Sequence, residues 1–210
     1  VAASRRVSVG FIFDSAQTKG HRYRSLPALR FLMESLEEVG DTVKAAGGFF
    51  NVWEGDPAQV LSEVLKVESI DAVFVNADYT PFSRERDERL KRVCEQAGVA
   101  FVSCHDALLH APGTVMTQAE TFFKVFTPFY KAALKKPIAS ISPLPHFSWH
   151  RSLLAGACAR IPQMLQEMVD ALPPFPVTGG RKAGLALLKR LHLYKKYSIE
   201  RDIPAAEGTT

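Results

Sequence analysis

A chain of 210 residues that is 47% hydrophobic and 23% charged has the composition of an ordinary globular protein, which excludes wholesale disorder. Its net charge of +4 is too small to indicate nucleic-acid binding by itself. The three cysteines are an odd number without short regular spacing, which argues against a disulfide framework and a zinc site. No apolar run is long enough to span a membrane, and no secretory signal is recognisable at the N-terminus. We therefore expect a soluble, intracellular protein.

Short apolar runs alternate with helix-like segments along the first half of the chain. The runs lie at residues 7–13, 48–53, 71–75 and 99–103. Each is typical of a buried parallel strand. The segments between them carry apolar residues at helical spacing, and the first of these helices is predicted to begin after Ser25 and to end at Gly47. This alternation predicts an α/β fold with a doubly wound parallel sheet.

The second half of the chain is less regular. An aromatic segment at residues 118–136 is helix-prone, and we expect its rings to pack in a core or against another domain. Closely spaced prolines predict a linker over residues 136–178, extended for the most part and with a short helical piece. Thr178 is expected to cap a last helix. The domains predicted from this pattern cover residues 1–135 and 179–210.

Ligands of parallel α/β sheets bind beyond the carboxyl ends of the strands, which directs attention to residues 14–23, 76–86 and 104–107. Asn76 and Asp78 directly follow a buried strand at this edge, His21 lies in the first loop, and Phe82 offers a ring that can stack on a flat ligand. The charged run that follows is typical of a solvated helix face. No phosphate-binding glycine loop, catalytic triad, pair of catalytic carboxylates or metal-ligand spacing occurs. We therefore expect no metal and no plain nucleotide-dependent enzyme.

Three segments carry signatures of a known family. VNADYTPFSRERDE at residues 75–88 resembles the pattern N-x-x-Y-x-P-x-x-x-x-R-D. PGTVMT…FFKVFTPFYKAAL at residues 112–134 and Y…RDIPAAEGTT at residues 197–210 resemble two further signatures, in the same order. The chain thereby resembles the DNA photolyase/cryptochrome family, with class I cyclobutane pyrimidine dimer photolyases as its nearest relatives.

The resemblance implies that residues 1–135 are a Rossmann-like antenna domain, residues 136–178 the interdomain linker and residues 179–210 the truncated beginning of a helical FAD domain. In the family, an antenna pigment (a folate, a deazaflavin or a flavin such as FMN) collects blue light. Reduced FAD then sends an electron to a pyrimidine dimer that is flipped out of the DNA.

The resemblance also assigns residues to these ligands. Tyr197, Thr209 and Thr210 match positions that touch FAD. His21, Asn76 and Thr80 correspond to the folate side of the antenna domain, and the position at the strand ends adds Asp78 and Phe82 as candidate contacts of an antenna pigment. Thr80 stands where folate-binding members often carry an acidic residue, which argues against folate.

Two departures from the family pattern limit what this chain is expected to do. The family's first strand and the rest of its flavin motif do not occur, so we expect a sheet one strand short of the usual five and no stoichiometric FAD on this chain alone. The chain as given is therefore expected to be an inactive part of a deoxyribodipyrimidine photo-lyase. In the complete protein we expect dimer-containing DNA to bind through the absent C-terminal domain, no membrane partner, and a monomer. A cryptochrome-like photoreceptor without repair activity and a small standalone nucleotide-binding protein remain alternatives, although residues 201–210 argue against the second.

Overall fold

Parallel strand pairs form at the apolar runs in the computed structural model of this chain. The structure describes residues 6–18, 24–105, 108–138, 147–161, 163–172, 177–195, 199 and 203. The chain divides into two units, one formed by residues 69–146 and the other by residues 3–68 together with 147–210. Each unit is described by itself below, as the β4–β5 unit and the β2–β3 unit.

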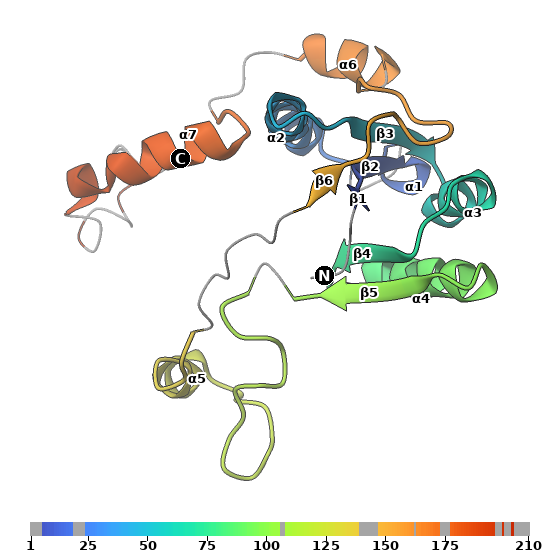
Figure 1. Cartoon of the computed structure of the whole chain (residues 1–210). Helices are drawn as coiled ribbons and strands as arrows, with labels where there is room; N and C mark the ends of the chain where they lie inside the picture. The colour runs from blue at the N-terminus through green and yellow to red at the C-terminus, as the bar shows by residue number, and fades with distance from the viewer. Residues whose placement is uncertain are drawn as a thin grey trace. The chain divides into compact units, whose positions relative to one another are not determined.

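The β2–β3 unit is built on a parallel pair of strands. Strand β2 (Val9–Asp14) pairs with β3 (Phe50–Gly55) from one end to the other (Figure 1). The connection between them contains α1 (Ser15–Thr18) and the long helix α2 (Leu26–Ala45), and β3 is followed by α3 (Pro57–Val67). A strand, a crossover helix and a parallel strand are the repeating unit that the sequence predicts.

Helix α2 begins and ends where its sequence predicts. The Ser25 hydroxyl accepts a hydrogen bond from the Ala28 amide at 3.3 Å, and a proline occupies the first turn. Leu29 and Met33 are buried on the inner face. The helix ends ahead of Gly47, whose φ of 84° only glycine adopts without strain.

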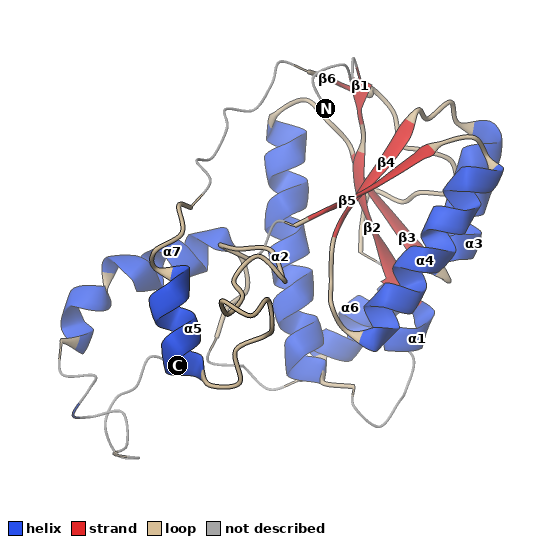
Figure 2. Ribbon diagram, turned by 90° about the horizontal axis from the view of Figure 1, so that it is seen from below, coloured by secondary structure: helices blue, strands red, loops and turns tan. Residues whose placement is uncertain are grey.

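Residues that follow position 146 complete this unit. Strand β1 (Arg6–Val7) pairs in parallel with β6 (Ser148–Trp149), and α6 (Gln163–Asp170) lies beside α2 (Figure 2). Val169 of α6 is only 5% exposed and belongs to the core of Phe13, Leu29, Met33 and Val52. Part of the predicted linker therefore packs into the core of the β2–β3 unit, and the predicted domain boundaries stay a prediction.

The side chain of Asn51 ties the two segments of this unit together. It is 1% exposed and is the second residue of β3. Its Nδ2 donates to the carbonyl of Val9 at 2.9 Å and to that of Phe49 at 3.3 Å, while its Oδ1 accepts from the Leu154 amide at 2.7 Å. A buried amide is stable in a core only when its donors and acceptor are satisfied, and here they are.

The β4–β5 unit contains the second strand pair. Strand β4 (Ala72–Asn76) leads into α4 (Pro81–Gln96), and β5 (Ala100–Cys104) returns beside β4 in parallel. Helix α4 packs on this pair with Leu90 and Cys94 buried. Burial raises the pKa of the Cys94 thiol, because a thiolate is poorly solvated there.

Helix α5 (Phe126–Ala133) covers only part of the aromatic segment that the sequence predicts to be helical. Phe122 and Phe126 are 71% and 72% exposed, and no residue of α5 is buried. The prediction that these rings form a core is therefore wrong, because too few other apolar side chains surround them among the described residues. Packing against another domain stays a prediction.

The last described elements are α7 (Arg181–Lys189) and a 3-10 turn (Leu191–Tyr194). The residue at the N-cap of α7 is Gly180, so the prediction that Thr178 caps this helix is wrong. The predicted fold class is confirmed: the structure is α/β, with its long strands paired in parallel. Among the described residues the strands form three two-stranded sheets, and a single sheet one strand short of five stays a prediction.

Candidate functional site

The carboxyl ends of β4 and β5 form the edge where the sequence predicts a ligand. Asn76 lies opposite Cys104 in the parallel register, and the amide of Ala77 donates to the Cys104 carbonyl at 2.8 Å. The chain therefore leaves both strands at the same edge of the pair. Asn76 is the last residue of β4 and is exposed.

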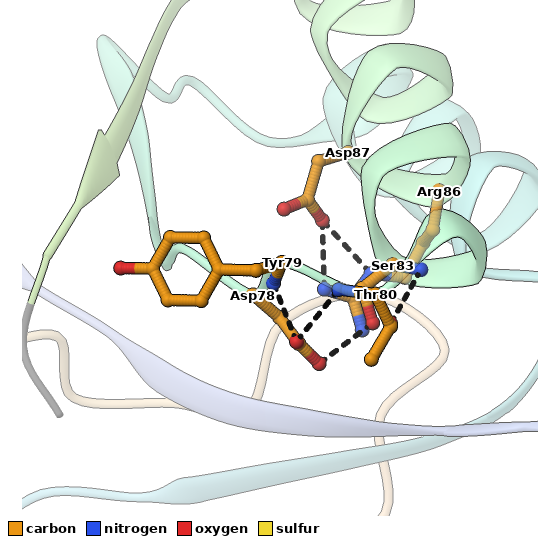
Figure 3. Close-up of polar contacts among 6 residues, drawn as sticks. All are labelled: Asp78, Tyr79, Thr80, Ser83, Arg86 and Asp87. Carbon is orange, nitrogen blue, oxygen red and sulfur yellow. Dashed lines mark hydrogen bonds and ion pairs between the residues drawn. The ribbon is translucent and has the colours of Figure 1, made fainter. Parts of the chain in front are cut away.

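Asp78, in the loop that leaves β4, accepts hydrogen bonds on both carboxylate oxygens. Oδ1 accepts from the amides of Tyr79 at 2.6 Å and Thr80 at 3.2 Å, and Oδ2 accepts from the Ser83 hydroxyl at 2.7 Å (Figure 3). The Ser83 hydroxyl is the main cause of a lowered Asp78 pKa, followed by the Thr80 amide. Each of these bonds favours the ionised carboxylate.

The next residues of this loop start helix α4. Thr80 is its N-cap, and its Oγ1 accepts from the Ser83 amide at 3.2 Å. Pro81 follows in the first turn, where the absence of an N–H has no cost. Asp78 and Thr80 thus cap a helix, a structural role that their spacing explains without any ligand.

The charged run of α4 is exposed at Arg84, Glu85 and Glu88 and half-buried at Arg86, Asp87 and Arg89. Arg86 donates through Nε to Asp87 at 2.9 Å, and its guanidinium lies 2.7 Å from the same carboxylate oxygen (Figure 3). Lys91 and Glu95 form a looser pair at 3.9 Å. The Lys91–Glu95 pair is exposed, and an exposed pair of this kind contributes little to stability.

Tyr79 and His105 both lie in loops that the sequence predicts at the carboxyl edge, but their contact with each other was not predicted. The Tyr79 hydroxyl lies 2.8 Å from Nδ1 of His105, and the two rings are stacked with centroids 5.9 Å apart and planes 14° apart. Tyr79 follows β4 and His105 follows β5, so the parallel pairing brings them together. Tyr79 is 43% exposed, and the pair presents an aromatic surface at the carboxyl edge.

The other predicted site residues fall in different places. Phe82 lies in the first turn of α4 and is 43% exposed. Asp14, at the end of β2, belongs to the β2–β3 unit, where its carboxylate accepts from the Ala16 amide at 2.8 Å. The remaining predicted residues lie outside the described part of the chain: His21, Tyr197, Thr209 and Thr210.

The described residues contain no cluster of three or more histidine, cysteine or carboxylate side chains arranged to hold a metal ion. No helix among the described residues is long and apolar enough to cross a membrane.

Comparison with known proteins decides the family. Residues 1–147 match the family model described as DNA photolyase. The chain belongs to the DNA photolyase family. Its similarity is to the N-terminal domain of photolyases and cryptochromes, so the predicted family is confirmed.

Two curated relatives and one solved structure illustrate the match. An uncharacterized 31.6 kDa protein of Synechococcus sp. PCC 6716 is 32% identical over 95% of this chain and 70% of its own length. The deoxyribodipyrimidine photo-lyase of Synechococcus sp. PCC 6301 is 26% identical over 86% of this chain, which spans 39% of that enzyme. A photolyase from Sulfolobus tokodaii, whose crystal structure contains two FAD molecules, is 31% identical in sequence and matches this fold with a TM-score of 0.71. The match covers 88% of this chain and 40% of the Sulfolobus chain.

Proposed function

We propose that this chain is the light-harvesting and structural half of a blue-light-dependent DNA photolyase that repairs cyclobutane pyrimidine dimers. The observation that carries this proposal is the family match over residues 1–147. It is supported by the similarity to the Sulfolobus photolyase, whose two FAD molecules imply a novel light-harvesting cofactor in that protein. A parallel α/β unit that holds a pigment at the carboxyl edge of its strands fits this role.

The repair step itself belongs to FAD and dimer-containing DNA in the complete protein. Reduced FAD supplies the electron that splits the dimer. The residues that the family resemblance assigns to FAD lie outside the described residues, so no step of the repair is assigned to the side chains described here.

The surface proposed to contact an antenna pigment is the stacked pair of Tyr79 and His105. Both rings are available at the carboxyl edge, and stacking on a flat conjugated ring is a common use of such surfaces. Asp78 is a weaker candidate than its position suggests, because both of its carboxylate oxygens already accept hydrogen bonds. Phe82 and Asn76 remain candidates at the same edge, and residues 14–23, also predicted to contact a pigment, belong to the β2–β3 unit.

Titration of the intact chain with FMN, FAD, a deazaflavin and a reduced folate, followed by pigment fluorescence, tests this assignment. We expect a flavin or deazaflavin to bind, and Tyr79→Ala together with His105→Ala to weaken its binding about 5- to 12-fold, as loss of a stacking contact of about 1–1.5 kcal/mol implies. Tyr130→Ala is the control, since it removes an equally exposed tyrosine from α5. Pigment binding that survives the double substitution unchanged would reject the stacked pair as the contact.

The wider proposal has a separate test in the complete protein. Blue-light-dependent repair of dimer-containing DNA is the expected activity, with DNA as the partner, a monomeric protein and an intracellular location. Pigment binding without any repair would instead favour a cryptochrome-like photoreceptor.

A further inference from the structure

We infer that one stripe of helix α2 is an intramolecular docking surface that attaches both α6 and α7 to the β2–β3 unit. The stripe consists of Arg30, Glu34, Ser35 and Glu38. Residues 30, 34 and 38 are spaced by four and lie above one another along the helix. In a sequence this pattern indicates ordinary charge pairs on a solvated face, whereas here each side chain contacts a distant segment.

Arg30 binds the carboxyl-terminal end of α6. Its guanidinium donates to the carbonyl of Val169 at 2.6 Å and to that of Leu172 at 3.0 Å. The last carbonyls of a helix have no partner within the helix and carry partial negative charge, so a cation is favourable there. The same end of α6 buries Val169 in the core, so the polar and apolar contacts act on one turn.

The two carboxylates of the stripe bind the amino-terminal end of α7. Glu34 accepts from the Gly179 amide at 2.6 Å, and both oxygens of Glu38 lie 3.1 Å from the Lys182 amide. Ser35 contributes its hydroxyl, which accepts from the Gly180 amide at 3.0 Å. The first amides of a helix carry partial positive charge and need acceptors, which α7 does not find in its own N-cap residue.

The two glycines allow this close approach. A Cβ at Gly179 would collide with the Phe31 carbonyl oxygen and would lie 2.9 Å from Oγ of Ser35. Gly180 has a φ of 100°, and a Cβ there would collide with a carboxylate oxygen of Glu38. Glycine at both positions is therefore a requirement of the docked geometry rather than a sign of a loose loop.

The charges along α2 are thus opposite in sign to the partial charges of the helix ends that they contact. Arg30 contacts the negative end of α6, and Glu34 and Glu38, one and two helical turns later, contact the positive end of α7. We infer that this match fixes where α7 starts, independently of any pigment or of FAD.

Hydrogen exchange of backbone amides in the intact chain, measured residue by residue by NMR, tests the inference. In the Glu34→Ala and Glu38→Ala double variant we expect the amides of Gly179 and Lys182 to exchange at least about tenfold faster, as loss of charged hydrogen bonds implies. Glu37→Ala is the matched control, because Glu37 lies on the same helix and has no hydrogen bond to residues 179–182 among those described.

Unchanged exchange in the double variant, or an equal rise in the control, would overturn the inference. Gly179→Ala gives a second test in which the carboxylates remain: the added methyl group should release the same amides while the amide of Met33 in α2 stays protected. Arg30→Leu should speed exchange only directly after α6, at Ala171 and Leu172, and an effect confined to α7 would contradict the assignment of Arg30.

Discussion

Replacement of Asn51 by alanine should destabilise the β2–β3 unit by about 3 kcal/mol. The substitution removes two good hydrogen bonds, to Val9 and from Leu154, and a longer one to Phe49. Each good bond contributes about 1 kcal/mol, and the buried backbone partners left without Asn51 add roughly another 1 kcal/mol or more. The free energy of unfolding decreases by about 1–3 kcal/mol per molar of urea, so the urea concentration at the midpoint of unfolding should fall by about 1–3 M.

Tryptophan fluorescence during urea unfolding is a suitable assay, because both tryptophans, Trp53 and Trp149, lie in the same unit as Asn51. Gln59→Ala is the control, since it removes an exposed amide from α3 and should change stability by less than about 0.5 kcal/mol. Asn51→Asp should be at least as harmful as alanine at neutral pH, because it loses the donor and adds a buried charge. A midpoint for Asn51→Ala equal to that of the control would refute the reasoning.

Two further predictions concern single side chains. A thiol reagent should label Cys104 and Cys158 quickly in the folded protein and Cys94 only after unfolding, because Cys94 is buried and its thiol pKa is raised; three equally fast thiols would contradict this burial. The folded state lowers the pKa of Asp78 below its ordinary value of 3.8, so the ionised carboxylate stabilises the folded state at any pH above 3.8. This stabilisation is lost as the pH falls through the pKa of Asp78 in the folded state. The difference in thermal midpoint between the wild type and Asp78→Ala, followed by circular dichroism, should therefore be constant above about pH 5 and shrink below pH 3.8; a difference that is flat from pH 6 to pH 3 would count against it.

Local signals in the sequence were sufficient for most of the regular structure. The Ser25 cap, the apolar face with Leu29 and Met33, and the glycine stop at Gly47 specify α2 by short-range physics, and the structure confirms them. Strands β4 and β5 likewise follow from their apolar runs, within one or two residues. These features depend on neighbours fewer than five residues away.

Side-chain contacts between distant segments could not be predicted from the sequence. Asn51 looks like an ordinary residue of a strand, and only the return of residues 154–158 shows why it is buried. Tyr79 and His105 are 26 residues apart and meet only because β4 and β5 are parallel. The Thr178 prediction failed for the same reason, since the partners of the α7 amides come from α2.

The free edge of β3 is covered by the chain's own later residues. Val52 exchanges two backbone hydrogen bonds with Cys158, at 2.8 and 2.9 Å, and the Trp53 indole donates to the Ala155 carbonyl at 3.0 Å. A fragment cut at residue 147, where the match to the family ends, would keep β2 and β3 but leave this edge open. Open strand edges recruit other chains, so such a fragment would aggregate, and any shortened version meant for solution work needs residues 148–172 as well.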